Sequence, residues 1–258
     1  MHVKADPGGF PQRKVSEIPS VSAAQMRDIQ RAAQEDFGID ILQITENAGR
    51  AAARLALAML GGRGRDHRVL VLAGGGNKGG AGLCAVRHLV NWRCLVEPVF
   101  GEVESEMSHA ALRQLNILRQ SGIVEPGDQE TMEITLEDHL SRADLVIDAL
   151  VGYGLSGPPT GIAGALTQLA VDSKKPILAL DIPSGINGST GVVSEPAIRA
   201  AATLMLDLPK KGALEPSARG HVGEMFLADI GIPRTVHERL GITVGYTFSE
   251  GPIVRIRR

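Results

Sequence analysis

A short apolar run that stops at a cluster of glycines sets narrow limits on the fold of this chain. Residues 68–73, RVLVLA, are apolar after the first position, and six glycines fall within residues 74–82. A continuous apolar run of this length is typical of a strand covered on both faces of a parallel sheet. Glycines let backbone amides approach a phosphate closely, and the helix that follows adds the positive end of its dipole. The segment therefore predicts a strand, a binding loop over residues 74–82 and a helix from residue 83.

The same alternation continues along the chain. Apolar runs predict strands at residues 95–100, 145–150, 176–182, 202–206 and 224–228, and helical spacing predicts helices at 23–35, 40–60, 83–90, 105–120, 136–142 and 163–171. Strands that alternate with helices imply right-handed crossovers and an α/β fold with an open, doubly wound, mostly parallel sheet. We expect residues 1–20 to form an N-terminal arm, residues 21–258 a single domain, and the closing Arg255, Arg257 and Arg258 a solvated basic end.

Composition excludes several classes of protein. Among 258 residues, 27 Lys and Arg stand against 29 Asp and Glu, and aromatic residues make up 3%, so no nucleic-acid partner is expected. No apolar run reaches the length of about 18 residues that a membrane span needs. The two cysteines, Cys84 and Cys94, are not spaced as a zinc pair and fit the reducing cytoplasm, and the scattered histidines predict no transition-metal site.

Two further strand ends carry acidic residues. Asp148 lies near the end of the run at 145–150, and Asp181 follows the apolar residues 177–180 and precedes Ser184. Ligands of doubly wound sheets bind beyond the carboxyl ends of the strands, so we expect these three side chains to converge beside the glycine loop. Two carboxylates and a hydroxyl could hold a cation or transfer a proton, although either acid alone could merely cap a helix.

A second interpretation of the glycine loop is a nicotinamide-dependent dehydrogenase. Gly74, Gly76 and Gly79 match G-x-G-x-x-G, and Glu97 lies about where an acid would bind ribose. Six glycines and an asparagine in nine residues exceed what that fingerprint requires, so the dehydrogenase is the lesser alternative.

Eight short motifs occur in order between Val21 and Ile232. They are Met26-Arg-Asp-Ile with Phe37-Gly-Ile, Glu46-Asn-Ala-Gly-Arg, Gly76 to Gly82, Arg87-His-Leu, Asp148 to Gly157, Asp181-Ile-Pro-Ser-Gly, Thr190-Gly and Pro209-Lys-Lys-Gly. Each is weak alone, but together they resemble the NAD(P)HX epimerase family, also called the YjeF N-terminal domain family.

The resemblance implies a Rossmann-like three-layer α/β/α fold and a homodimer. It also implies an activity, the interconversion of the R and S epimers of hydrated NADH or NADPH (NADHX and NADPHX) at carbon C6 of the nicotinamide ring. A separate dehydratase then acts on the S epimer, and we expect it to be absent here because the chain ends near the limit of the epimerase domain.

By position, the resemblance assigns the residues of the site. Asp181 is the expected proton-transfer residue, and a potassium ion would lie at the positions of Lys78, Asp148 and Ser184. The implied substrate-binding residues are Gly76, Asn77, Lys78, Gly79, Gly80, Ala81, Gly152, Tyr153, Gly154, Leu155, Ser156, Gly157, Pro158 and Asp181.

Three positions depart from the family pattern. Lys78 replaces an asparagine that binds potassium, Ala81 replaces an aspartate, and Gln30 stands where an aspartate is usual. An ammonium has no lone pair for a metal, so we hypothesise that Lys78 occupies the potassium position, paired with Asp148 and in contact with Ser184. The other interpretation directs Lys78 to solvent or to a phosphate. Because polar groups are lost, a catalytically weakened or inactive nucleotide-binding or protein-interaction module remains the alternative function.

Overall fold

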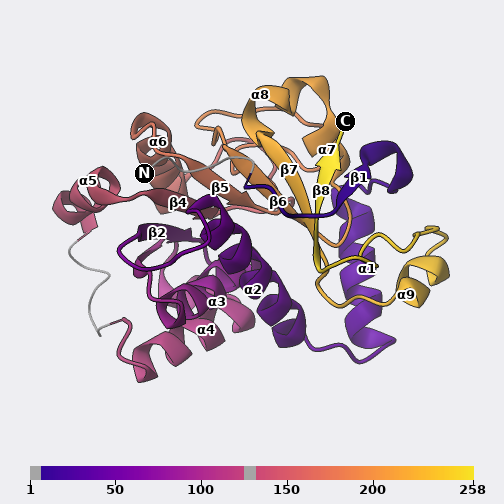
Figure 1. Cartoon of the computed structure of the whole chain (residues 1–258), viewed down its shortest axis with the longest axis horizontal. Coiled ribbons are helices and arrows are strands. Elements are labelled where there is room, and N and C mark those ends of the chain that lie inside the picture. The colour runs from indigo at the N-terminus through magenta and orange to yellow at the C-terminus, as the bar shows by residue number, and fades with distance from the viewer. Residues whose placement is uncertain (1–6, 125–131) are drawn as a thin grey trace.

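The computed structural model, which describes residues 7–124 and 132–258, is built on an eight-stranded sheet (Figure 1). The strands are β1 (Gln12–Lys14), β2 (Arg68–Ala73), β3 (Leu95–Phe100), β4 (Leu145–Ala149), β5 (Ile177–Leu180), β6 (Ala202–Leu206), β7 (Glu224–Ala228) and β8 (Ile253–Arg257). Their order in the sheet is β1-β8-β7-β6-β5-β4-β2-β3. Among these described strands, all neighbouring pairs are parallel except β7–β8, which is antiparallel. The predicted mostly parallel sheet is confirmed.

Helices cover both faces of this sheet. They are α1 (Ala23–Glu35), α2 (Ile41–Met59), α3 (Asn77–Asn91), α4 (His109–Gln120), α5 (Met132–Arg142), α6 (Gly161–Asp172), α7 (Lys211–Leu214), α8 (Arg219–Val222) and α9 (Arg234–Arg239). In β2, Val69 and Val71 pack into the core that α1 to α4 share, whereas Leu70 and Leu72 pack into a second core with α5 and α6. Successive side chains of a strand point to opposite faces, so one apolar run supplies both cores.

The first two helices begin at capping boxes, whose paired residues stand three positions apart in the sequence. Ser22 and Gln25 bond reciprocally, with the Ser22 Oγ accepting from the Gln25 amide at 3.2 Å and the Gln25 Oε1 accepting from the Ser22 amide at 2.9 Å. The side chain of Asp40 accepts from the Leu42 amide, and that of Gln43 accepts from the Asp40 amide. These side chains satisfy amides that have no partner within the helix.

The glycine segment differs from its prediction because α3 begins at Asn77 and not at residue 83. A Cβ on Gly79 would lie 1.7 Å from the carbonyl oxygen of Gly74, and one on Gly74 would lie 2.0 Å from that of Leu150. These glycines therefore allow the first helical turn to pack directly on the strand ends. The binding loop is reduced to residues 74–76.

Two other boundaries are shifted for local reasons. The strand predicted at 176–182 ends at Leu180, because Asp181 has a φ of 65° and turns the chain out of the sheet. The helix predicted from residue 105 begins at His109, because the Ser108 side chain caps it and a 3₁₀ turn occupies Glu104–Glu106.

The two ends of the chain join the sheet. Gln12–Lys14 pairs in parallel with β8, so this part of the predicted arm forms an edge strand. The expectation of a solvated basic end was wrong for Arg255, because β8 pairs with β7 and Arg255 lies 2.6 Å from Glu224, whereas Arg257 and Arg258 are exposed. The apolar residues of β8, which are Ile253, Val254 and Ile256, are buried.

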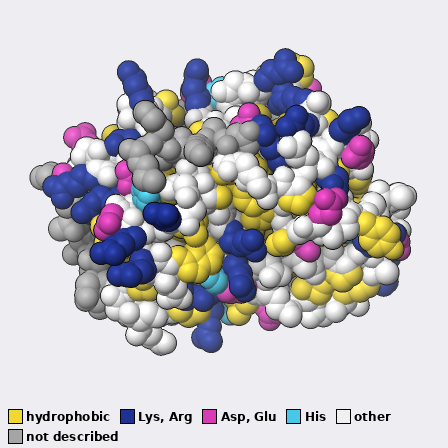
Figure 2. All heavy atoms as spheres, in the orientation of Figure 1, with side chains coloured by type: hydrophobic (Ala, Val, Ile, Leu, Met, Phe, Trp, Pro, Cys, Tyr) yellow, Lys and Arg dark blue, Asp and Glu magenta, His cyan; other side chains and the backbone are white. Residues whose placement is uncertain are grey.

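Charges are spread over the surface. On the face seen in Figure 2, Lys and Arg side chains lie among acidic and apolar ones, in keeping with the net charge of −2. None of the helices in the described ranges is long and apolar enough to cross a membrane.

Candidate functional site

A cavity of about 590 Å³ opens at the carboxyl ends of β2 and β4. The chain leaves β2 through α3 to β3 on one side and later returns to β4 on the other, so the crevice between β2 and β4 is the switch point of the sheet. Residues 74–78 and 150–154 line it from these strand ends, and α1 and α2 contribute the other wall.

The glycine loop presents a helix N-terminus to this cavity. Gly76 is the N-cap of α3 and has no side chain to accept the first-turn amides. A Cβ on Gly76 would meet nothing within 4 Å, so the backbone here borders open space. Free amides and the positive end of the helix dipole together suit an anion such as a phosphate.

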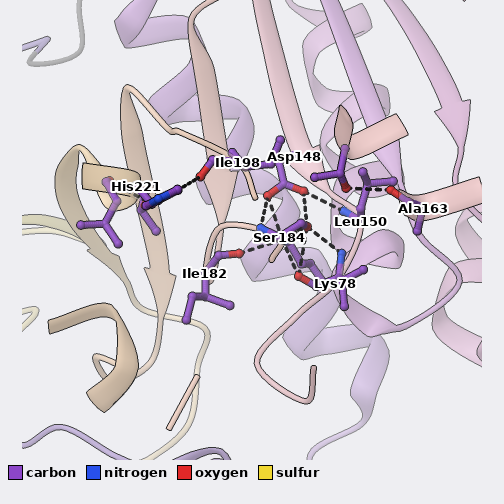
Figure 3. A network of polar contacts seen from close by, with 12 residues as sticks. Lys78, Asp148, Leu150, Ala163, Ile182, Ser184, Ile198 and His221 are labelled. Atoms are coloured by element: carbon purple, nitrogen blue, oxygen red, sulfur yellow. Dashed lines mark hydrogen bonds and ion pairs between the residues drawn. The ribbon is translucent and has the colours of Figure 1, made fainter. Parts of the chain in front are cut away.

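Lys78 is part of the cavity lining, and its Nζ lies within a shell of oxygen atoms (Figure 3). Its Nζ donates to the carbonyl oxygens of Ile182 at 2.8 Å and Val151 at 2.9 Å. It also donates to Asp148 Oδ2 at 3.2 Å and to Ser184 Oγ at 3.3 Å. The predicted contacts to Asp148 and Ser184 are present, and with 8% of Lys78 exposed the interpretation that directs it to solvent or phosphate was wrong.

The partners of Lys78 are themselves held firmly. Asp148 is fully buried, and its Oδ1 accepts from the Ser184 hydroxyl at 2.6 Å and from the Leu150 amide at 3.1 Å. Its Oδ2 accepts from the Ser184 amide at 2.8 Å. The shell thus forms from three different strand ends, those of β2, β4 and β5 (Figure 3).

Lys78 is protonated in this arrangement. Two carbonyl oxygens and one carboxylate oxygen are obligatory acceptors, and only an ammonium has three N–H groups to satisfy them. Burial lowers the pKa of Lys78 from its usual value, and the charges of Asp148 and Asp181 oppose that shift.

The residues present do not fit a potassium ion. Carbonyl, carboxylate and hydroxyl oxygens are suitable ligands for such a cation, but the Nζ of Lys78 already lies at hydrogen-bond distance from all four of them. An ammonium cannot act as a ligand, and it would repel a second cation at this position.

Asp181 and Lys210 form a second buried ion pair, at the cavity wall. Asp181 Oδ1 lies 2.6 Å from Lys210 Nζ, with 4% of Asp181 and none of Lys210 exposed. The Leu206 amide donates to the same carboxylate at 3.2 Å, and its carbonyl accepts from Lys210 at 2.7 Å. Asp181 also keeps a left-handed backbone, which is uncommon outside glycine and clusters at functional sites.

Tyr153 connects this pair to α1. Its hydroxyl donates to Gln30 Oε1 at 2.7 Å, and its ring centroid lies 5.7 Å from the Lys210 Nζ. Burial and the charge of Asp181 raise the pKa of Tyr153 above its usual value, although Arg27 opposes this. Gln30, noted in the sequence only as a lost acid, therefore has a role as the partner of this phenol.

The structure places the predicted site residues in four groups. Asp148 and Ser184 lie in the buried shell, while Gly79 and Gly80 pack against Gly74 and the start of α4. The residues that line the cavity are Gly76, Asn77, Lys78, Ala81, Gly152, Tyr153, Gly154 and Asp181. Outside its lining lie Leu155, Ser156, Gly157 and Pro158.

Sequence reasoning missed three charged residues of the cavity, namely Arg27, Glu102 and Glu106. It considered Glu97, but this residue lies within β3, 3.9 Å from His139 and away from the cavity lining. The signal for Glu102 was available, because it is the first acid after the predicted strand at residues 95–100.

Two motifs of the resemblance join α2 to α3 through side chains outside the cavity lining. Glu46 on α2 pairs with Arg87 and, at 2.8 Å, with His88, both on α3. The ligand atoms of Glu46, Cys84 and His88 lie within 4.8 Å of one another, as in a metal site. Arg87 already contacts that carboxylate, however, and burial raises the pKa of Cys84.

Comparison with known proteins agrees with this fold. Residues 42–212 match the family described as YjeF-related protein N-terminus. The crystal structure of yeast ynu0 superposes with a TM-score of 0.78 over 92% of this chain and 100% of that one, at 21% identity.

Curated relatives are similar over longer stretches. The NAD(P)H-hydrate epimerase of Dehalogenimonas lykanthroporepellens is 38% identical over 242 residues, which cover 93% of each chain. That of Rhodopirellula baltica is 33% identical, covering 86% of this chain and 88% of its own. The bifunctional NAD(P)H-hydrate repair enzyme Nnr of Thermofilum pendens is 34% identical, but this chain spans only 41% of it. The chain therefore belongs to the YjeF N-terminal domain family.

Proposed function

We propose that this protein is an NAD(P)H-hydrate epimerase, which interconverts the R and S forms of NADHX and NADPHX. Relatives that carry this name are similar over nearly their whole length. The observation that carries the proposal is the buried Asp181–Lys210 pair in the wall of a cavity whose floor includes the N-terminus of α3. That combination offers a proton-transfer group and a phosphate site within one crevice.

The chemistry requires inversion at a carbon that carries a hydroxyl and the ring nitrogen. Protonation of the hydroxyl lets the nitrogen lone pair expel water, which leaves a planar iminium carbon. Water then adds to the opposite face and returns a proton. Asp181 is the proposed acid–base group: it relays a proton from Lys210, 2.6 Å away, to the leaving hydroxyl, and the water that adds returns a proton by the same path, so the ion pair ends as it began.

The Lys78 ammonium replaces potassium in this proposal. Its four oxygen partners are of the kinds that ligate a monovalent cation, and the positive charge beside Asp148 is retained without an ion. Catalysis should therefore not depend on potassium. Crystals soaked in rubidium should show no ion between Asp148 and Ser184.

The test follows consumption of the R epimer of NADHX in the presence of excess S-specific dehydratase. Wild-type protein should accelerate it equally in potassium and in sodium at constant ionic strength, and Asp181→Asn should not accelerate it. Absence of acceleration by the folded wild-type protein would refute epimerisation. Binding of NADH to that inactive protein would then favour the nucleotide-binding module, an interpretation that Ala81 and Gln30 motivate.

The proposal includes a homodimer and a separate dehydratase, both acting in the cytoplasm. The bifunctional relatives, of which this chain spans 41%, support a partner activity outside these 258 residues. Light scattering of the purified protein measures the assembly.

A further inference from the structure

We propose that Glu102 makes the site selective for NADHX over NADPHX, by binding the adenosine ribose and repelling a phosphate on its 2′ oxygen. This inference rests on the proposed function, since it concerns the same cavity. It assigns a role to one of the three charged cavity residues that the sequence analysis missed.

The position of Glu102 follows from the β2–α3–β3 unit. β3 lies parallel beside β2, and Glu102 comes one residue after Gly101, which follows the end of β3. In a dinucleotide-binding unit of this kind, the pyrophosphate lies at the helix N-terminus and an acid some 20 residues or more along the chain binds the ribose hydroxyls. The carboxyl end of β3 is therefore where a ribose acceptor belongs, and Glu102 lines the cavity there.

The glycine loop fixes the side chain of Glu102. A Cβ on Gly75 would lie 2.7 Å from its Cγ and 3.0 Å from its Cβ, so the glutamate stem packs on the bare backbone of Gly75. The Gly75 carbonyl accepts from the Ser108 amide at 2.7 Å, which fastens the β3–α4 connection to the loop. The carboxylate is thus tied to the same loop that would hold the phosphates.

One carboxylate oxygen remains for a ligand. Glu102 Oε1 accepts from the Val103 amide at 3.0 Å, whereas Oε2 has no hydrogen-bond partner within residues 7–124 and 132–258. Its free lone pairs are suited to the two hydroxyls of an adenosine ribose, because a carboxylate accepts hydrogen bonds and does not donate them.

The charges around Glu102 disfavour a 2′-phosphate. Glu106 lines the cavity from the same connection, and neither acid forms an ion pair with a described residue. The cations of the lining are Lys78, which donates to its oxygen shell, and Arg27, which belongs to α1 and not to this connection. A phosphate beside Glu102 would meet two carboxylates.

The experiment compares kcat/KM for the R epimers of NADHX and NADPHX, with excess dehydratase that accepts both. We expect kcat/KM of the wild-type protein to be higher for NADHX than for NADPHX by about tenfold or more, because the loss of one hydrogen bond to a charged group costs about that much in free energy. Glu102→Gln should raise kcat/KM for NADPHX and so lower the ratio of kcat/KM for NADHX to that for NADPHX. Glu104→Gln is the control. Glu104 belongs to the same connection but pairs with Arg119 and does not line the cavity, so its replacement should leave the ratio unchanged.

Equal use of both epimers by the wild-type protein, or an equal fall for both substrates in Glu102→Gln, would overturn the inference. Calorimetry measures the affinity of the same variants for NADH and for NADPH. It therefore tests the preference between the two nucleotides without any catalytic turnover. A chain that epimerises nothing but prefers NADH through Glu102 would refute the proposed function and leave this inference standing. Equal binding of the two nucleotides, or binding of neither, would refute the inference.

Discussion

Replacement of Lys78 by methionine removes the ammonium and keeps most of the side-chain volume. The change leaves Asp148 buried without its cation, and leaves the carbonyl oxygens of Val151 and Ile182 without the donor they share. If the ammonium is an integral part of the fold, its loss must destabilise the protein.

The magnitude follows from what Asp148 retains. Removal of one partner of a buried ion pair costs about 3–5 kcal/mol. Asp148 still accepts three hydrogen bonds, from the Ser184 amide, the Ser184 hydroxyl and the Leu150 amide. These favour the lower end of the range, about 3 kcal/mol, which for a chain of this size lowers Tm by about 6–12 °C.

Thermal and urea unfolding measure the effect, with Lys174→Met at an exposed lysine as the matched control. Lys78→Asn adds a second readout, because it opens the oxygen shell to an ion. We expect its Tm to rise in potassium chloride relative to choline chloride, while the wild-type Tm does not change. A loss below about 1 kcal/mol in Lys78→Met, against the ~3 kcal/mol expected, would refute the reasoning.

Three further predictions concern other parts of the structure. Asp181→Asn should lower kcat for the R epimer by about 10²–10⁴-fold with an unchanged circular dichroism spectrum, and a loss under threefold would exclude Asp181 from proton transfer. A Cβ on Gly79 would lie 1.7 Å from the Gly74 oxygen, whereas one on Gly76 would meet nothing within 4 Å. Gly79→Ala should therefore lower Tm strongly, whereas Gly76→Ala should keep Tm and raise KM; equal Tm values would contradict this. Burial alone would lower the pKa of His237, but the Asp207 carboxylate, 2.9 Å away, raises it above its usual value. The stabilisation from this pair should be complete below about pH 6.5 and lost as the pH rises through the folded pKa, so urea unfolding of His237→Gln should depend less on alkaline pH than that of the wild type.

Local patterns in the sequence predicted much of the fold. Capping at Ser22 and Asp40 depends on residues three positions apart, and the strand 68–73 depends on its own apolar run, so neither needs knowledge of the tertiary structure. The acids at residues 148 and 181 were identified for the same reason, because Asp148 lies near the end of an apolar run, Asp181 directly follows one, and strand ends of a parallel sheet meet at one edge.

The order of the strands decided the rest. Two of the four oxygen atoms around Lys78 are backbone carbonyls from residues 151 and 182, and since every residue has such a carbonyl, no sequence pattern identifies them. Glu102, and not Glu97, reaches the cavity because the loop after β3 packs on Gly75. Arg255 looked like part of a free end until β8 was seen to pair with β7, far away in the sequence. The sequence by itself therefore determined the elements and which residue types stand at their ends, whereas only the tertiary structure decided which of those groups meet, because such contacts depend on chain segments that are distant in sequence and adjacent in the sheet.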